Sequence, residues 1–254
     1  MKKITALLTL MFTLTAALAA ADFSVSAGAG GYVGYLFTRY TLTADGEISG
    51  APVNVNAAQE MDQFNFGGFV FADLTWVKFS MGLQRGFNNY SETMIAVIDD
   101  PGTDDIIMPS AGKGSETMWN FSLLGKYPFT FNEQITLFPM LGMEYQVALE
   151  QRRTPDRRSE YNRADGIREA DVNGDPYSLS AWNSLFVVAG GGVDYRMFSS
   201  LFVRAELLFG FRLQTPYETD ALAKTKKGVN APNPKLGGLT GGPALSISAG
   251  WRFL

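Results

Sequence analysis

Apolar residues recur at every second position along several segments of this chain, and this spacing is what most constrains its fold. Near the end of the chain, Leu245, Ile247, Ala249, Trp251 and Phe253 alternate with serine, glycine and arginine. Successive side chains of a strand point to opposite faces, so a strand here has one apolar face, whereas a helix would scatter these residues around its surface. The alternation therefore predicts β-structure with one face kept away from water.

A leader precedes the first of these segments. Lys2 and Lys3 supply a positive start, an apolar run follows, and the small residues of 17–21 suit a signal peptidase. We expect residues 1–21 to be a cleaved signal peptide and Asp22 to begin the mature chain. No later stretch has the ~18 consecutive apolar residues of a membrane-spanning helix. A mature chain that crosses a membrane must then do so as a closed barrel, because closure pairs every backbone group in lipid.

Composition narrows the possible functions. The 254 residues include no cysteine and no histidine, which argues against a disulfide scaffold or lipid attachment to an N-terminal cysteine, and removes the commonest metal ligand and proton shuttle. The formal net charge of −4 is unlike the basic footprint of a nucleic-acid-binding protein. An acyl-transfer enzyme needs a base beside its nucleophile, usually histidine. We therefore predict no enzymatic activity, no cofactor, no metal site and no nucleic-acid partner.

Eight segments carry the alternation, and their connections alternate in length. Short connections are expected at 74–75, 128–133 and 196–199. Long polar loops are expected at 43–62, 91–115, 151–178 and 215–242. Short turns at one end and long loops at the other are typical of outer-membrane barrels, whose turns face the periplasm. The predicted strands are 23–42, 63–74, 76–90, 116–127, 134–150, 179–195, 200–214 and 243–254.

The two faces of the predicted strands differ in chemistry, but alternation alone does not say which face is outside. A soluble, lipocalin-like barrel would place the apolar face inside. A stripe of six or seven apolar positions instead matches a lipid-facing band of ~25 Å. Aromatic residues also gather at the strand ends, as in interfacial girdles. They are Phe37, Phe64, Phe87 and Trp119 at the loop end and Phe23, Tyr127, Tyr195 and Phe253 at the turn end.

The opposite face would line a lumen that the side chains of an eight-stranded barrel can fill. Its charged residues are predicted to form buried ion pairs, and a polar path for solutes is the alternative. The ion-pair candidates are Lys78, Glu144, Arg204, Glu206, Arg212 and Arg252. Apolar residues on the same face either fill the core or line a narrow pocket for a small apolar solute. These ligand candidates are Phe69, Phe71, Phe138, Met140, Phe186 and Leu208.

The third predicted loop is the most charged part of the chain. Its arginines are interspersed with a similar number of acids, which is typical of a solvated surface. Arginine forks also suit phosphate, so binding of lipid phosphates or of a surface partner is the alternative. The surface-binding candidates are Arg152, Arg153, Arg157 and Arg158.

The leader, the pattern of long and short connections and the terminal Trp251-Arg252-Phe253-Leu254 resemble the small eight-stranded outer-membrane proteins of bacteria, of the OmpW, OmpX and OmpA-barrel kind. The resemblance implies an all-β, antiparallel up-and-down barrel over residues 22–254, in contact with outer-membrane lipid. The OmpW likeness implies a narrow channel or binding barrel for small hydrophobic molecules. The OmpX likeness implies a surface-contact or structural barrel without transport. The inward apolar residues favour the first alternative.

Overall fold

The computed structural model describes residues 24–48, 51–98, 106–155, 183–214 and 235–253. Nearly all of these residues lie in antiparallel strands, because the alternating segments pair with one another along their whole length. The strands are β1 (Val25–Ile48), β2 (Ala51–Leu74), β3 (Val77–Ile98), β4 (Ile106–Lys126), β5 (Phe129–Thr130), β6 (Ile135–Pro155), β7 (Ser184–Arg196), β8 (Leu201–Gln214) and β9 (Lys235–Arg252).

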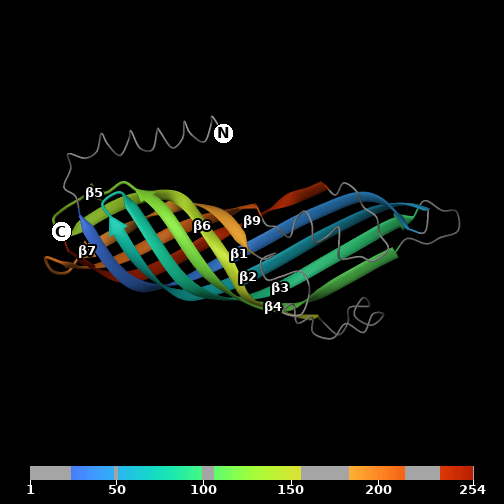
Figure 1. Cartoon of the computed structure of the whole chain (residues 1–254), viewed down its shortest axis with the longest axis horizontal. Coiled ribbons are helices and arrows are strands. Elements are labelled where there is room, and N and C mark those ends of the chain that lie inside the picture. The colour runs from blue at the N-terminus through green and yellow to red at the C-terminus, as the bar shows by residue number, and fades with distance from the viewer. Residues whose placement is uncertain (1–23, 49–50, 99–105, 156–182, 215–234, 254) are drawn as a thin grey trace, which may run out of the picture.

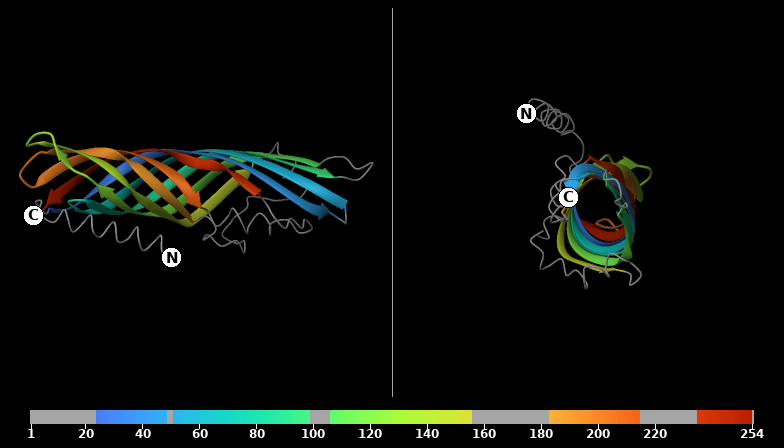
Figure 2. Two further views of the ribbon diagram at one scale, coloured as in Figure 1. Left: turned by 90° about the horizontal axis from the view of Figure 1, so that it is seen from above. Right: turned by 90° about the vertical axis from the view of Figure 1, so that its right-hand side faces the viewer.

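Eight of these strands form a closed ring, which is seen end-on in Figure 2. β1 to β4 pair in sequence, β4 pairs with β6, and β6 to β9 pair in sequence before β9 returns to β1. The remaining strand, β5, has two residues and pairs with β6. Neighbours in the ring are thus neighbours in the chain. The predicted all-β, eight-stranded antiparallel up-and-down barrel is confirmed.

The connections at one end of the barrel, which we call the turn end, are short. They comprise residues 75–76, 127–134 and 197–200, and β5 lies within the second of them. Ser26 near the start of β1 pairs with Arg252 at the end of β9. The first and last strands therefore meet at the turn end, as an even number of strands requires (Figure 1).

At the opposite end, which we call the extended end, β1 to β4, β6 and β9 run further than the sequence indicated. The loops predicted at 43–62 and 91–115 are wrong, because most of their residues are paired in strands. Polar residues suggested loops there, but a strand requires only that its backbone N–H and C=O groups have partners. β6 and β9 likewise extend into the other two predicted loops. Three predicted segments lie wholly or largely outside the described residues: 1–21, 151–178 and 215–242.

β1 to β4 reach beyond the other strands at the extended end (Figure 1). β9 pairs with β1 no further than Thr43, and β6 pairs with β4 no further than Gly112. Beyond these two residues, β1 to β4 form a four-stranded sheet with one edge on β1 and the other on β4. We call this part the protruding sheet. Neither of its edges is paired within the described part of the chain.

The outer surface of the barrel is apolar. Leu141, Leu207 and Ile247 are each at least 60% exposed, although they lie in the middle of strands. The charged residues that alternate with the apolar stripe are buried inside the ring, so the soluble-barrel arrangement is wrong for this chain. Exposed aromatics lie at the turn end, including Tyr127, Tyr195 and Phe253, and in the middle of β2 and β3, where Phe64 and Phe87 lie because both strands continue past the predicted girdle. This surface has the pattern of a lipid-facing band between two aromatic girdles.

No helix within the described ranges is long and apolar enough to cross a membrane.

Candidate functional site in the lumen

The turn-side half of the lumen is filled by a cluster of six charged residues centred on Arg204, which we call the charge cluster. Arg204 Nε lies 2.6 Å from Asp194 Oδ1, and Arg204 Nη2 lies 2.7 Å from Asp73 Oδ2. Lys126 Nζ reaches the same Asp73 oxygen at 2.5 Å. Three cations face three carboxylates, so the cluster is formally neutral. Its members are Asp73, Lys78, Lys126, Asp194, Arg204 and Glu206.

Aromatic rings surround the charge cluster. The guanidinium carbon of Arg204 lies 4.8 Å from the ring centre of Phe138 and 5.1 Å from those of Phe71 and Phe202. All three rings are buried, as is Arg204 itself. Cations over ring faces are attracted by the ring quadrupole, so the rings stabilise the cluster as well as fill space. Together, the charge cluster and these rings close the turn-side half of the lumen.

Apolar side chains lie next to the charge cluster on one side of the lumen. The buried group consists of Leu124, Phe138, Met140, Phe186 and Val188, and Leu36 and Leu208 pack against it while only partly buried. Leu208 is only partly buried because part of its surface borders a cavity in the lumen.

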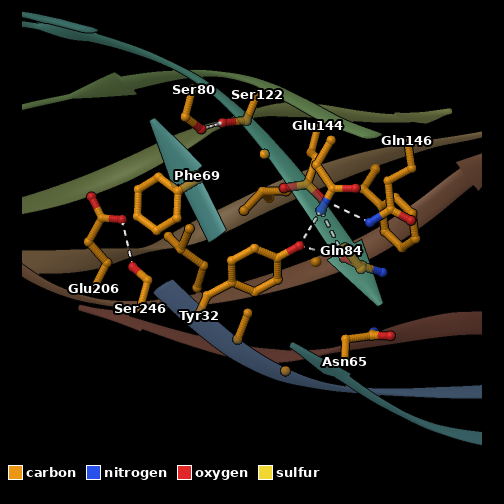
Figure 3. Close-up of a pocket in the computed structure, with 18 of the residues that line it drawn as sticks. Tyr32, Asn65, Phe69, Ser80, Gln84, Ser122, Glu144, Gln146, Glu206 and Ser246 are labelled. Atoms are coloured by element: carbon orange, nitrogen blue, oxygen red, sulfur yellow. Dashed lines mark hydrogen bonds between the residues drawn. The ribbon is translucent and has the colours of Figure 1, made fainter. Parts of the chain in front are cut away.

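A cavity of about 120 Å³ lies in the middle of the lumen, on the extended side of the charge cluster (Figure 3). Its apolar wall includes Phe69, Phe186, Val188 and Leu208, which come from β2, β7 and β8. A cavity of this size is about ten times the minimum needed for one water molecule and is comparable to cavities that hold benzene. The barrel therefore encloses room for a small ligand.

The polar wall of the cavity is a hydrogen-bonded network. Tyr32 donates its hydroxyl proton to Gln84 Oε1 at 2.9 Å, and Asn120 Nδ2 donates to both Tyr32 Oη at 2.7 Å and Gln84 Oε1 at 2.8 Å. These three residues come from β1, β3 and β4, so the network joins β1 to β3 and β4 inside the lumen, past the intervening strand β2. Figure 3 shows Tyr32 and Gln84 of this network. Ser80 and Ser122 bond to one another at 2.5 Å on the same wall.

Two acids complete the polar wall of the cavity. Glu206 accepts both from Lys78 Nζ at 2.6 Å and from Ser246 Oγ at 2.9 Å, so it joins the cavity to the charge cluster. Glu144 accepts a hydrogen bond from Gln146 Nε2 at 2.8 Å. Within the described ranges, no lysine or arginine nitrogen lies within 4.0 Å of the Glu144 carboxylate.

A second polar network lies on the extended side of the cavity. Glu116 accepts hydrogen bonds from Gln63 and from Gln151, the latter at 2.6 Å. Thr240 donates to Thr38 at 3.1 Å on the adjoining side. All five of these residues are buried. The cavity is thus bounded by the charge cluster toward the turn end and by this amide and hydroxyl network toward the extended end.

The structure divides the predicted ligand candidates into two groups. Phe69, Phe186 and Leu208 line the cavity. Phe71, Phe138 and Met140 also point into the lumen, but they are at least 96% buried beside the charge cluster and do not line the cavity. The difference arises from register around the ring, which sets the height at which each inward residue lies.

The structure also divides the predicted ion-pair candidates, into residues that form ion pairs and residues that do not. Lys78, Arg204 and Glu206 form ion pairs in the charge cluster. Arg212 instead bonds to the Ser184 hydroxyl at 2.7 Å and lies over the Phe186 ring. Among the described residues, three of the six candidates form no ion pair: Glu144, Arg212 and Arg252.

The surface-binding candidates fall mostly at the edge of the described structure. Arg152 is exposed and pairs with Glu150 at 2.7 Å. Arg153 pairs with Gly114 in the ladder between β6 and β4. Arg157 and Arg158 lie outside the described residues, so surface binding through them stays a prediction.

The polar network of Tyr32, Gln84 and Asn120 was not singled out from the sequence. The signal that could have found it is the inward parity of these residues on their strands, since each lies next to at least one apolar outward residue, such as Val33, Leu83 and Trp119. Parity identifies them as lumen residues, but only the register between strands shows that all three meet.

No family model matches the chain, and no curated protein matches its sequence. Similar solved structures include the outer membrane protein OprG from Pseudomonas aeruginosa, with 11% identity over 90% of this chain and 95% of that one and a TM-score of 0.33. Ail, the attachment invasion locus protein of Yersinia pestis, shows 10% identity over 91% and 99% of the two chains and a TM-score of 0.26. Both are small bacterial outer-membrane barrels, the kind of protein that the sequence resembles. The fold assignment itself rests on the closed ring of strands.

Proposed function

We propose that this chain is an outer-membrane β-barrel that binds a small amphipathic molecule in its lumen cavity. The observation that carries the proposal is the cavity itself, which has an apolar wall, a polar wall and about 120 Å³ of space inside a barrel whose outer face is apolar. Ligand sites are typically concave, largely apolar and furnished with a few placed polar groups. The exposed apolar band and the leader of residues 1–21 support the outer membrane as its location.

The turn-side half of the lumen favours binding over free passage. Lys78, Asp73, Arg204 and Glu206 are each no more than 2% exposed, and their ion pairs cross the lumen. Moving a solute past them would require separating buried charges, and each separation leaves an uncompensated charge in a dry site. We therefore assign the barrel a binding role, in which any transport requires rearrangement of the charge cluster.

The test fills the cavity without disturbing the rest of the wall. A Cβ placed on Gly210 lies 3.5 Å from the nearest atom, on Phe186, so Gly210→Leu can project into the cavity without a backbone clash. Gly68 lies on the outer face and a Cβ there lies 3.7 Å from its nearest neighbour, so Gly68→Leu adds the same side chain toward lipid. The two variants make a matched pair.

Binding would be measured with benzyl alcohol as the probe, by amide chemical shifts of the barrel in lipid nanodiscs. We expect saturable shifts at cavity residues such as Tyr32 and Ser246 in the unmodified protein and in Gly68→Leu. The shifts should be lost in Gly210→Leu, provided that its spectrum shows a folded barrel. Absence of saturable shifts at the lumen in the unmodified protein would refute the proposed function.

The protruding sheet supports a second candidate function, contact with a partner outside the cell. Its backbone edges on β1 and β4 are available for pairing in the described structure, and an exposed strand edge is a template for another strand. Binding of a partner to the protruding sheet would not depend on the lumen cavity. A partner that binds Gly210→Leu as well as the unmodified protein would support this alternative.

A further inference from the structure

The lumen carboxylates differ in whether a cation neutralises them. Asp73, Asp194 and Glu206 each contact a lysine or arginine at 2.5–2.7 Å. Glu144 has no such partner within 4.0 Å among the described residues, and the group that bonds to it is the neutral amide of Gln146. Burying a carboxylate is costly unless it is paired, so the position of Glu144 requires a compensating interaction.

Glu144 faces the cavity and not the packed wall. It is one of the residues that line the cavity, and it remains partly accessible there although it belongs to the middle of β6 (Figure 3). The charged residues of the lining are Lys78, Glu144 and Glu206, so one positive charge faces two negative charges. Lys78 is already paired with Glu206, because its Nζ lies 2.6 Å from both oxygens of that carboxylate. The cavity therefore carries a formal charge of −1, located at Glu144.

The apolar part of the lining can hold an apolar body beside a cation, because Phe186 on β7 is paired directly with Glu144 on β6. Phe69 and Phe186 present rings to the cavity, and Val188 and Leu208 supply aliphatic surface. Aromatic faces attract ammonium groups and also pack against apolar ones. The size of the cavity limits the ligand to roughly the bulk of a substituted benzene.

We propose that the lumen cavity selects small organic ammonium ions, with the ammonium group paired to Glu144 and the apolar body against Phe69 and Phe186. This inference rests on the proposed function, because it specifies the ligand class of the same cavity. The negative charge of Glu144 and the aromatic rings of the lining point to the same ligand chemistry. An anionic ligand of equal size would meet two carboxylates and should be excluded.

Three probes of one shape test the selection: benzylammonium, benzyl alcohol and benzoate. Each would be titrated into the barrel in nanodiscs of zwitterionic lipid, with saturable amide shifts at Tyr32 and Ser246 as the readout. We expect benzylammonium to bind roughly tenfold or more tightly than benzyl alcohol, since hydrogen bonds to charged groups are stronger than neutral ones. Benzoate should not bind. Equal affinity for benzylammonium and benzyl alcohol in the unmodified protein would overturn the proposal.

The variant Glu144→Gln then tests whether Glu144 causes the preference for benzylammonium over benzyl alcohol. It should bind benzyl alcohol as before, which also shows that it folds, and should lose the preference for benzylammonium. Glu150→Gln is the matched control, because Glu150 lies on the same strand but pairs with Arg85 at 2.8 Å outside the cavity lining. A preference that survives Glu144→Gln would refute the role of Glu144. If Glu144→Gln does not fold, the comparison of the three probes on the unmodified protein and on Glu150→Gln decides the proposal.

The two proposals fail in different ways. If none of the three probes causes saturable shifts at the lumen, the proposed function itself is wrong. If benzyl alcohol binds and benzylammonium has no advantage, the binding function stands and only the ligand class is wrong.

Discussion

Phe138 on β6 lies directly opposite Gly192 on β7, and its ring covers the place that a side chain at residue 192 would occupy. A Cβ built on Gly192 would lie 2.6 and 2.7 Å from two carbons of the Phe138 ring. Phe138 is 2% exposed, and the same ring is contacted by Arg204 and Lys126 at 4.8 and 5.2 Å. The charge cluster thus depends on a glycine that makes room for the ring beside it.

This relationship predicts the effect of a single methyl group. Gly192→Ala should reduce the free energy of unfolding by about 1–3 kcal/mol, which is the usual cost of overpacking a well-packed core. Gly210→Ala is the control on the same face of the barrel, because its new methyl group meets nothing closer than 3.5 Å. Urea unfolding of barrels reconstituted in lipid vesicles would measure both. Gly192→Ala should cost less in a Phe138→Leu background than in the unmodified protein, and an equal cost in the two backgrounds would show that the ring is not the cause.

The charge cluster should be sensitive to loss of its central arginine. Arg204→Met leaves Asp194 without a cation in a buried site, and breaking a buried ion pair in this way costs about 3–5 kcal/mol. Arg212→Met removes an arginine that bonds to a hydroxyl and forms no ion pair within the described residues, so it should cost less. Comparison of the two unfolding free energies tests this order. Equal losses would mean that the cluster adds nothing beyond the packing of an arginine side chain.

If the outer surface faces lipid, the free-energy cost of an arginine on it should depend on its depth in the bilayer. Leu207 is 60% exposed in the middle of β8, so Leu207→Arg should oppose insertion by about 2–4 kcal/mol, the cost of an arginine near the bilayer midplane. Asn89 is also exposed on the outer face, but it lies beyond the girdle residue Phe87 on β3. Asn89→Arg should cost ~0–1 kcal/mol. Folding yields into vesicles would report the difference, and equal yields would contradict a lipid-facing band at Leu207.

The β1–β2 half of the protruding sheet should be separable from the barrel. Thr43 and Asn56 are paired across β1 and β2, so residues 44–55 can be replaced by an Asn-Gly turn, which suits a two-residue hairpin. Because β9 pairs with β1 no further than Thr43, the shortened chain keeps the pairing that closes the ring. We expect it to fold in nanodiscs and to bind benzyl alcohol like the full chain. Failure to fold would show that this half of the protruding sheet is required to form the barrel.

The turn ends of the strands were predicted within two residues, whereas most of the extended ends were not, although β8 does end at Gln214 as predicted. Leu74 and Lys126 lie beside short turns, where apolar alternation stops abruptly, and the sequence marks such places well. At the extended end, segments such as 54–60 are rich in asparagine and alanine and do not show a lipid-facing stripe. Backbone pairing with a neighbouring strand, and not burial of an apolar face, holds these residues in the sheet.

Alternation along each strand was sufficient to predict a barrel with one apolar and one polar face, because the side-chain period of a strand is two. The length of the apolar stripe and the aromatic residues then predicted that the apolar face meets lipid. Alternation could not determine the site. Phe69 and Phe138 have the same parity, yet one lines the cavity and the other is packed against Arg204. Likewise, Glu144 and Glu206 are both inward acids, yet only Glu206 meets a cation among the described residues. Those outcomes depend on the register between eight strands, which sets the height of each side chain in the lumen and is a property of the closed ring.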